Sequence, residues 1–272
     1  MREIFLEELK QIQLDMVVKI DEFCRKNGIK YFLAGGTGIG AARHKGYIPW
    51  DDDIDIAMTR PNYEKFIHSF NGFDKNLVVY ASELDWNYYA PYANVCDNRT
   101  ILSEGAIGHR GQELGVKVDV FPIDGTTDNY ISSVIRHKFT KLLTQIMSRK
   151  RRDMSIVWRT DKWKFFTCLV VQTLFCWISY TTLQKMVYRI GIKYPFETSQ
   201  YAYNIVSSDY NHPVSCRRET YEQYIDVPFE GHTLMTIKDY DTYLTRVYGD
   251  YMQLPPVEQR VGHHGFTAYW KD

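Results

Sequence analysis

The sequence predicts a mixed α/β protein, with an α/β unit in residues 1–125 and a largely helical second part, residues 126–272, packed on it. Three observations carry this prediction. Apolar side chains recur at helical spacing in residues 3–27, strand-like runs alternate with helical runs up to residue 125, and helical patterns dominate residues 130–192. The chain of 272 residues is 44% hydrophobic, which is enough to fill a substantial core.

The elements of the first part follow from periodicity and from turn residues. Apolar residues three and four positions apart give the first helix one buried face, and Asn27-Gly28 ends it. Pro61 suits the first turn of a later helix, where its missing N–H costs nothing. In chain order, the expected elements are a helix at 3–27, a strand at 30–34, a short helix at 37–44, a strand at 53–58, a helix at 62–70, and strands at 77–81, 88–96, 100–103 and from 116 until Pro122 ends it.

Composition limits the partners of the chain. Lys and Arg total 33, and so do Asp and Glu, so the formal net charge is zero, which argues against a nucleic-acid-binding protein. The five cysteines include no Cys-x-x-Cys pair, which indicates free thiols in a reducing compartment and disfavours a zinc site. The N-terminus, MREIFLEELK, is charged and has no apolar signal core. We therefore expect a cytoplasmic protein.

Four acids crowd into residues 51–55, at the entrance of the strand expected at 53–58. Alternate strand residues point the same way, roughly 7 Å apart, so Asp53 and Asp55 would project from one face. Like charges held at this spacing repel each other unless a cation lies between them, and Mg²⁺ or Mn²⁺ takes carboxylate ligands. The cluster is therefore either a divalent metal site or a solvated acidic loop, and the acids alone leave both readings open.

A glycine turn, Gly35-Gly36-Thr37, lies upstream of the acids and follows a short strand. Glycine lets the backbone approach a ligand closely, and a helix N-terminus attracts phosphate. The turn is not a Walker P-loop, because no Gly-Lys-Ser/Thr follows, and its glycines do not fit the dinucleotide fingerprint. It is either a phosphate cradle or an ordinary turn. A cradle beside a metal site would indicate a nucleoside diphosphate or triphosphate bound with its metal.

A further acid, Asp119, stands between Val118 and Val120 on a short apolar strand. A lone charge there is costly to bury unless it is paired or bound to metal. If this strand lies beside that of Asp53 and Asp55, three carboxylates converge. Asp119 would then be a metal ligand and the proton acceptor for an attacking hydroxyl. The alternative is an Asp that points to solvent from an exposed strand face.

Three segments together resemble the LicD family of phosphotransferases. They are YFLAGGTGIGAARHKGYIPWDDDIDIAMTRPNYEKF, VDVFPIDG and YGDYMQLPPVEQR, so the resemblance runs through nearly the whole chain. The family is a branch of the nucleotidyltransferase superfamily, which implies a mixed sheet with flanking helices, as in DNA polymerase β. The superfamily pattern of a Gly-Gly-Ser/Thr turn, two acids on a strand and a third acid on a later strand falls on Gly35, Gly36 and Thr37, on Asp53 and Asp55, and on Asp119.

The resemblance implies Mg²⁺-dependent transfer of phosphocholine, or a similar phospho-alcohol, from a CDP-linked donor such as CDP-choline to a sugar hydroxyl, with release of CMP. The acceptor would be a cell-surface glycan precursor, for example of teichoic acid or lipopolysaccharide. Asp53, Asp55 and Asp119 would hold the metal, and Asp119 would take the acceptor proton. Arg43 and Lys45, just past the glycine turn, are candidates to bind phosphate, with plain surface charges as the alternative.

A choline group would need aromatic faces around its quaternary ammonium. The chain offers many aromatic side chains, and its sequence does not choose among them. The candidates are Trp86, Tyr88, Tyr89, Tyr248 and Trp270. The transferred alcohol, whether choline, ribitol, glycerol or ethanolamine, therefore stays open.

A basic run, Arg149 to Arg152, precedes a stretch without charge from Phe165 through Gln184. Seven of those twenty residues are polar, which is poor for a membrane-spanning helix. The segment is either a buried core helix or an interfacial helix beside a basic patch on the inner face of an anionic membrane. The second alternative would suit a lipid-linked glycan acceptor.

Two other functions fit parts of the pattern. A glycosyltransferase would use a sugar nucleotide through the same acids, although the Gly-Gly-Thr turn counts against its usual nucleotide-binding unit. An inactive nucleotide-binding protein would need none of the acids, whereas all three are present. Release of CMP from CDP-choline in the presence of Mg²⁺ would separate these alternatives.

Overall fold

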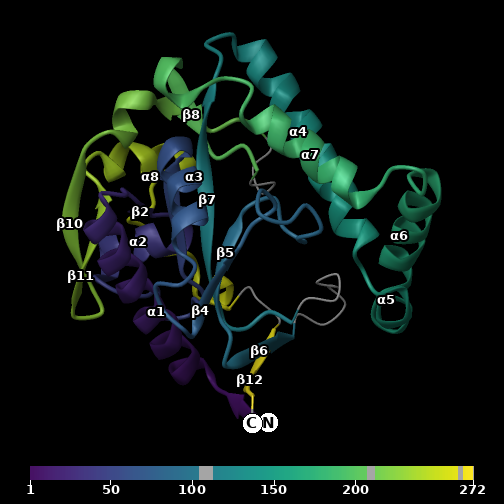
Figure 1. Ribbon diagram of the computed structural model, residues 1–272, viewed down its shortest axis with the longest axis horizontal. Coiled ribbons are helices and arrows are strands. Elements are labelled where there is room, and N and C mark those ends of the chain that lie inside the picture. Colours follow the sequence, from purple (N-terminus) through teal and green to yellow (C-terminus); the bar gives the residue numbers. More distant parts are fainter. Residues whose placement is uncertain (104–112, 207–211, 263–265, 272) are drawn as a thin grey trace.

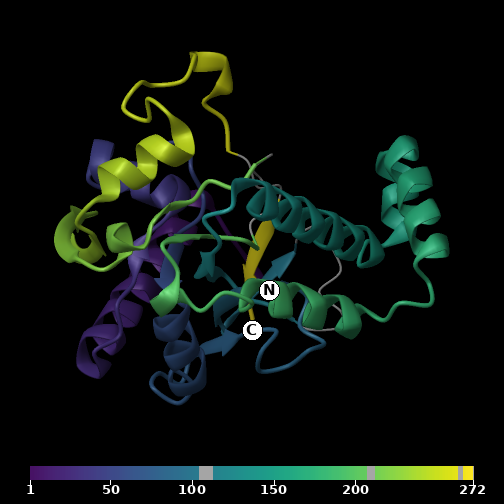
Figure 2. The same cartoon turned by 90° about the horizontal axis from the view of Figure 1, so that it is seen from above.

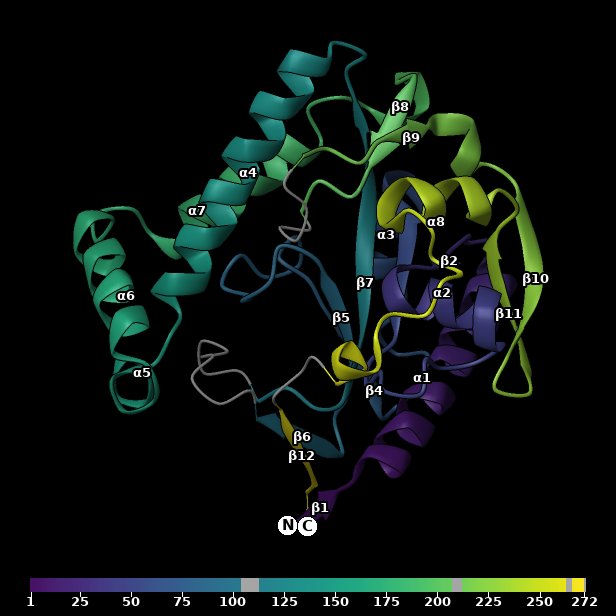
Figure 3. The same cartoon turned by 180° about the vertical axis from the view of Figure 1, so that it is seen from behind.

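A computed structural model describes residues 1–103, 113–206, 212–262 and 266–271 of the chain (Figure 1). A mixed sheet forms its centre, with helices packed against it and a pair of helices standing apart at one edge. The two chain ends lie side by side in the three cartoon views (Figures 1–3). The mixed α/β class predicted from the sequence is confirmed.

The main sheet joins the strands that carry the acids. Its order is β2-β3-β7-β5-β4, and β8 and β9 extend it beyond β7. The β3 and β7 strands run parallel, whereas the other pairs are antiparallel. The strands are β2 (Phe32–Leu33), β3 (Asp55–Thr59), β4 (Leu77–Tyr80), β5 (Ala93–Asp97), β7 (Lys117–Thr126), β8 (Tyr201–Tyr203) and β9 (Cys216–Arg217).

Helices α1 (Leu6–Asn27), α2 (Gly35–His44) and α3 (Arg60–Ser69) pack on this sheet and bury apolar faces against it. The core around α1 and α3 is rich in aromatic edge contacts. Phe23 meets Phe66 and Phe70 with ring centroids 6.0 and 5.1 Å apart. Gly28 ends α1 in a left-handed conformation, as the sequence predicts.

Two smaller sheets complete this part. The strands β1 (Arg2–Ile4), β12 (Thr267–Trp270) and β6 (Thr100–Ser103) form one of them, which ties both chain ends together. The hairpin of β10 (Tyr224–Phe229) and β11 (His232–Ile237) packs on β2 and α1, and α8 (Tyr240–Tyr248) lies against α2. Figure 3 shows the hairpin and α8 beside the main sheet, on the side away from α5 and α6.

The prediction that Pro122 ends its strand is wrong, because β7 continues to Thr126. Backbone N–H groups of alternate strand residues point to opposite neighbours. The Asp119 N–H donates toward β3, to the Ile54 carbonyl, so the nitrogen of Pro122 faces the other side. On that side β5 pairs with β7 only up to Val120. Pro122 therefore occupies a position where no donor is needed.

Two other strand predictions are longer than the strands that form. The strand expected at 88–96 begins only at Ala93, because Pro91 lacks an N–H and the Tyr88 and Ala90 carbonyls accept from the Gln184 side chain. The strand expected at 53–58 begins at Asp55, where pairing with both β2 and β7 becomes possible. Asp53 therefore lies in the segment before the strand.

Residues 130–191 form helices, as predicted: α4 (Tyr130–Lys150), α5 (Met154–Thr160), α6 (Lys162–Leu174) and α7 (Tyr180–Gly191). The α4 and α7 helices pack side by side along their own apolar cluster. The α5–α6 pair lies to one side of the sheet, as Figures 1 and 2 show. Within the described ranges, each helix is too short or too polar to cross a membrane.

Candidate active site

The parallel pairing of β3 and β7 brings two of the predicted acids together. Asp55 and Asp119 are register partners, so their backbones are separated by the strand spacing of about 4.8 Å, and their side chains project from the same face of the sheet. This is the strand adjacency that the sequence interpretation required. Two backbone contacts hold the entrance of the strands: Asp119 N–H donates to Ile54 O at 3.1 Å, and Ala34 N–H donates to Asp55 O at 2.9 Å.

The three acids before the strand form a cluster of their own. One carboxylate oxygen from each of Asp51, Asp52 and Asp53 lies within 4.8 Å of the others. Asp53 is not in the strand, so the predicted start of the strand at Asp53 is wrong, although the charge of Asp53 still acts on Asp55 and both belong to one acidic centre. Asp51 and Asp52, which strand alternation did not single out, join it through the shape of the preceding loop.

The carboxylates of the acidic centre, which comprises Asp51, Asp52, Asp53, Asp55 and Asp119, repel one another. Burial, together with the charges of Asp53, Asp119 and Asp51, raises the pKa of Asp55 well above its ordinary value, and Lys117 acts in the opposite direction. A divalent cation would relieve this repulsion. The donor set consists of carboxylate oxygens, which fits Mg²⁺ or Mn²⁺.

The glycines of the predicted phosphate cradle lie against these acids. Gly35 and Gly36 open α2, and Gly35 has a left-handed φ of 56°. A Cβ atom on Gly35 would lie 2.7 Å from Asp55 Oδ2, and one on Gly36 would collide with the carboxylate of Asp51. The double glycine thus lets the start of the helix approach the acids, where its backbone dipole favours negative charge. Thr37 is buried, and its hydroxyl accepts the Asp55 N–H at 2.9 Å.

Asp119 is held by residues that the sequence interpretation did not assign. Lys117 Nζ lies 3.4 Å from Asp119 Oδ1, and the Asn94 amide donates to the same oxygen. Asn94 is fully buried, and its own oxygen accepts from Tyr88 and Tyr89 hydroxyls. The only sequence signal for this network is a polar residue within an apolar strand, which becomes informative once Asn94 and Asp119 are known to be register partners.

Arg43 and Lys45 lie at the far end of α2. Helix geometry puts Lys45 about 13 Å along the axis from Gly36. The guanidinium of Arg43 donates to the backbone carbonyls of Tyr251, at 2.7 Å, and Gln253, at 3.1 Å. The structure therefore does not bring these two bases to the acids, and Arg43 instead holds the C-terminal segment on α2.

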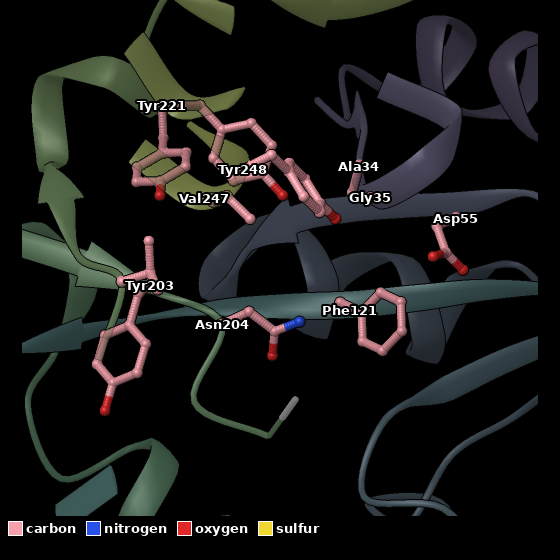
Figure 4. A pocket seen from close by; sticks show the side chains of 11 residues that line it. Ala34, Gly35, Asp55, Phe121, Tyr203, Asn204, Tyr221, Val247 and Tyr248 are labelled. Atoms are coloured by element: carbon pink, nitrogen blue, oxygen red, sulfur yellow. The ribbon is translucent and has the colours of Figure 1, made fainter. Parts of the chain in front are cut away.

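An aromatic pocket adjoins the acids (Figure 4). Gly35 and Asp55 line one side, and Phe121, Asn204 and several tyrosines line the rest. Its aromatic walls include Tyr203, Tyr221, Tyr243 and Tyr248. A second pocket is lined by Asp53, Asp119 and Lys117, so the acidic centre borders two cavities.

The other candidate cage residues lie elsewhere. Tyr88 and Tyr89 are buried beside Asn94, Trp86 packs on Tyr188, and Trp270 contacts Arg2 and Arg99. Of the five aromatic residues that the sequence offered, Tyr248 is the one that lines the pocket beside Asp55.

A buried ion pair supports the far end of β7. Asp124, fully buried, accepts from Arg60 Nε at 2.7 Å and from Arg60 Nη2 at 2.9 Å. Glu83 adds a contact of 3.1 Å to the same guanidinium. This bidentate pair anchors the start of α3 to β7, and the sequence analysis assigned it no role.

Carboxylates gathered at paired strands, beside a glycine-opened helix and an aromatic pocket, form an arrangement that would suit a divalent cation and a phosphate ester. Comparison with known proteins specifies the family. Residues 28–139 match the profile described as "LicD/FKTN/FKRP, nucleotidyltransferase domain". The chain is 30% identical over 276 residues to the lipopolysaccharide cholinephosphotransferase LicD of Haemophilus influenzae, with 99% of each chain covered.

A shorter match points the same way. Over 31 residues, 11% of this chain and 6% of the relative, the sequence is 52% identical to the ribitol 5-phosphate transferase FKRP of Homo sapiens. By their names, both relatives are phosphotransferases. The chain belongs to the LicD family, which confirms the resemblance found in the sequence.

Proposed function

We propose that the protein transfers phosphocholine, or a similar phospho-alcohol, from a CDP-linked donor to a sugar hydroxyl of a glycan precursor and releases CMP. The observation that carries the proposal is the register pairing of Asp55 with Asp119 beside the Asp51–Asp53 cluster. The cholinephosphotransferase and the ribitol 5-phosphate transferase among its relatives support the class of reaction. The acceptor class is that of lipopolysaccharide or teichoic acid precursors.

The proposed site divides the roles among the chain's own residues. Asp53, Asp55 and Asp119 would hold Mg²⁺ or Mn²⁺. Asp51 and Asp52, which each have a carboxylate oxygen within 4.8 Å of one from Asp53, would contribute. The ion, when bound, neutralises the diphosphate of the donor. Gly35 and Gly36 present the start of α2 to that diphosphate, whose charge suits a helix N-terminus. Catalysis then depends mainly on positioning and charge neutralisation.

The proposed step is an in-line displacement. The acceptor oxygen forms a bond to the phosphorus that bears the alcohol, the P–O bond to the CMP phosphate breaks, and CMP leaves with the bridging oxygen. Asp119 takes the proton of the acceptor hydroxyl. Lys117 and Asn94 hold the Asp119 carboxylate in a fixed direction, which is what a general base requires.

The aromatic pocket beside Asp55 is the proposed site of the transferred alcohol. The faces of tyrosine rings attract a quaternary ammonium, and Tyr248, 39% exposed, lies at its edge. Choline is the alcohol that this lining favours.

We further propose a nucleotidyltransferase-like catalytic core in residues 1–125, with residues 126–272 packed on it. All three proposed acids and the glycine turn precede residue 125, and the matched family profile covers residues 28–139. The pairing of β8 with β7 would join the two parts through the main sheet.

A donor screen tests the proposed function. CDP-choline, CDP-ribitol, CDP-glycerol, CDP-ethanolamine and a UDP-sugar are each incubated with the protein and a glycan acceptor, with Mg²⁺ or with a chelator, and nucleotide release is measured. We expect CMP release from one CDP-alcohol, dependent on Mg²⁺ and stimulated by the acceptor. Release of UDP from the UDP-sugar alone would favour a glycosyltransferase, and no release from any donor would favour an inactive nucleotide-binding protein.

A further inference from the structure

The α6 helix carries an apolar stripe that faces solvent. Trp163, Phe166, Val170 and Leu174 follow one another at intervals of three and four residues, and Trp177 continues the series just after the helix. Trp163 is 83% exposed and Trp177 77%, and the three residues between them are exposed as well. An amphipathic helix normally turns such a stripe toward the core, so this face lacks the cover that its composition calls for.

A second stripe on α4 belongs to the same surface. Ile131, Ile135, Phe139 and Leu142 lie four, four and three residues apart, and all four are exposed. Leu142 lines an open groove together with Trp163, Phe166 and Val170 of α6. The two stripes therefore form one continuous apolar surface, far larger than a scatter of single exposed residues. We call it the arm surface.

The arm surface stands away from the acids. Figures 1 and 3 show α5 and α6 at the edge of the molecule, separated from the main sheet by α4 and α7. Its exposed residues are therefore not needed to hold the acidic centre in place.

Positive charge is concentrated in the segment that carries the arm surface. Residues 130–177 contain ten Lys or Arg and two Asp, a net charge of +8, whereas the whole chain is neutral and the rest carries −8. Exposed basic residues flank the two stripes: Lys138 on α4, Arg159 on α5, and Lys162 and Lys164 on α6. A basic rim around an apolar face complements a surface that is anionic at its border and apolar beneath.

The basic run from Arg149 to Arg152 contributes less to the arm surface than its sequence suggests. Lys150 Nζ donates to the Phe175 carbonyl at 2.7 Å, and the Arg151 guanidinium lies 4.7 Å from the centre of the Tyr89 ring. Both residues are half-buried. The side chains available to an external anion are instead those of the flanking lysines and Arg159.

We propose that the arm surface docks on a lipid bilayer that carries anionic headgroups. The apolar stripes enter the boundary between headgroups and acyl chains, Trp163 and Trp177 lie at that boundary, and the basic rim contacts the headgroups. Tryptophan suits this depth because its ring is apolar and its N–H is polar. The inference goes beyond the proposed reaction and does not rest on it.

Vesicle binding by the full chain tests the proposal. Vesicles of phosphatidylglycerol mixed with phosphatidylcholine are compared with vesicles of phosphatidylcholine alone, at low and at physiological salt. We expect sedimentation with the anionic vesicles, weakened by salt because the charges are screened over about 8 Å at 0.15 M ionic strength. Three of the six tryptophans lie in this region, so brominated lipids should quench a large part of the intrinsic fluorescence.

Two variants and a control locate the contact. Replacing Trp163, Leu174 and Trp177 with Ser should abolish sedimentation with anionic vesicles, and replacing Lys138, Arg159, Lys162 and Lys164 with Gln should remove the preference for anionic vesicles. Each basic residue near such a surface is worth roughly fivefold in affinity, so the second variant should bind up to about 10³-fold more weakly. The control replaces Phe5 and Val257, 70% and 72% exposed but outside the arm surface, with Ser. It should bind as the wild type does.

The outcomes are distinguishable. The proposal is overturned if wild-type protein stays in solution with anionic vesicles at low salt, or if it binds neutral vesicles equally well. It is also overturned if the control loses binding as much as the arm variants do. A wild-type dimer that the Ser variants dissociate, without vesicle binding, would show that a second copy of the chain covers this face. CMP release in solution tests the reaction separately, so either proposal can fail alone.

Discussion

Replacing Asp55 with Asn should stabilise the metal-free protein while it abolishes turnover. Asp55 is the register partner of Asp119 and lies near the charges of Asp53 and Asp51. An Asn of the same shape keeps the contact with Gly35 but carries no charge. The mutually repelling centre therefore loses part of its repulsion, and the proposed metal site loses a ligand.

The size of the effect follows from the strand spacing. Two unit charges about 4.8 Å apart repel by roughly 3.5 kcal/mol at an effective dielectric constant near 20. Lys117, 3.4 Å from Asp119 Oδ1, offsets part of this repulsion. We therefore expect about 1–3 kcal/mol of added stability, which for a chain of this length raises Tm by about 2–10 °C.

The difference in stability between the wild type and Asp55→Asn should depend on pH, and the raised pKa of Asp55 gives its sign. The folded chain holds the Asp55 proton more tightly than the unfolded chain, because its pKa is raised. The free energy of unfolding of the metal-free wild type should therefore fall as pH rises from the ordinary carboxyl range through that raised pKa. The Asn variant does not titrate at this position, so the two proteins should match at low pH and diverge as pH increases.

Thermal unfolding with and without Mg²⁺ is the assay. The wild type should gain stability from the ion, by about 2.7 kcal/mol at a hundred times its dissociation constant, whereas Asp55→Asn should gain little. Asp128→Asn, a change at an exposed acid outside the cluster, is the matched control and should behave like the wild type. An Asp55→Asn variant that is less stable than the metal-free wild type at neutral pH, or that keeps near-normal activity, would show that Asp55 is neither a source of repulsion nor a required metal ligand.

Three further predictions concern the base, the pocket and the scaffold. Asp119→Ala should lower the rate of transfer by about 10²–10⁴-fold with little change in donor affinity. A loss under about tenfold in single-turnover assays would show that Asp119 is not the general base. Tyr248→Ala should raise KM for CDP-choline by about 2–30-fold and leave the neutral CDP-ribitol and CDP-glycerol unchanged, with Tyr130→Ala as the exposed control. Equal effects on the choline, ribitol and glycerol donors would argue against a choline pocket. Asp124→Ala should cost about 3 kcal/mol in urea unfolding, because it leaves Arg60 buried without its main partner; an unchanged midpoint would show that Glu83 and Glu64 suffice.

Local signals predicted the elements whose causes are local. Helical spacing and the Asn27-Gly28 stop located α1, and the order of strands and helices around the glycine turn was correct because each follows from a few neighbouring residues. The strand prediction at Pro122 was wrong because the end of the β5 pairing, which leaves the proline nitrogen without a required partner, is set by residues far away in the chain.

In the candidate site, too, the sequence did not predict the contacts that depend on residues far apart in the chain. The acids of 51–55 and Asp119 stood out because charges are rare on apolar strands, but the support of Asp119 by Asn94 and Lys117 depends on strand register. Arg43 and Lys45 seemed close to the glycine turn in sequence, yet a helix of ten residues carries them away from it. The exposure of the α6 stripe could not be read from its composition, because a buried helix has the same apolar spacing.

The location of the bound cation tests the central claim most directly. Crystals of the protein soaked with Mn²⁺ and CDP-choline allow the ion to be placed by its anomalous scattering. We expect a peak contacted by the carboxylates of Asp55 and Asp119 and by at least one acid of residues 51–53, with the donor diphosphate beside Gly35 and Gly36. A donor bound elsewhere, or an ion that avoids both Asp55 and Asp119, would contradict it.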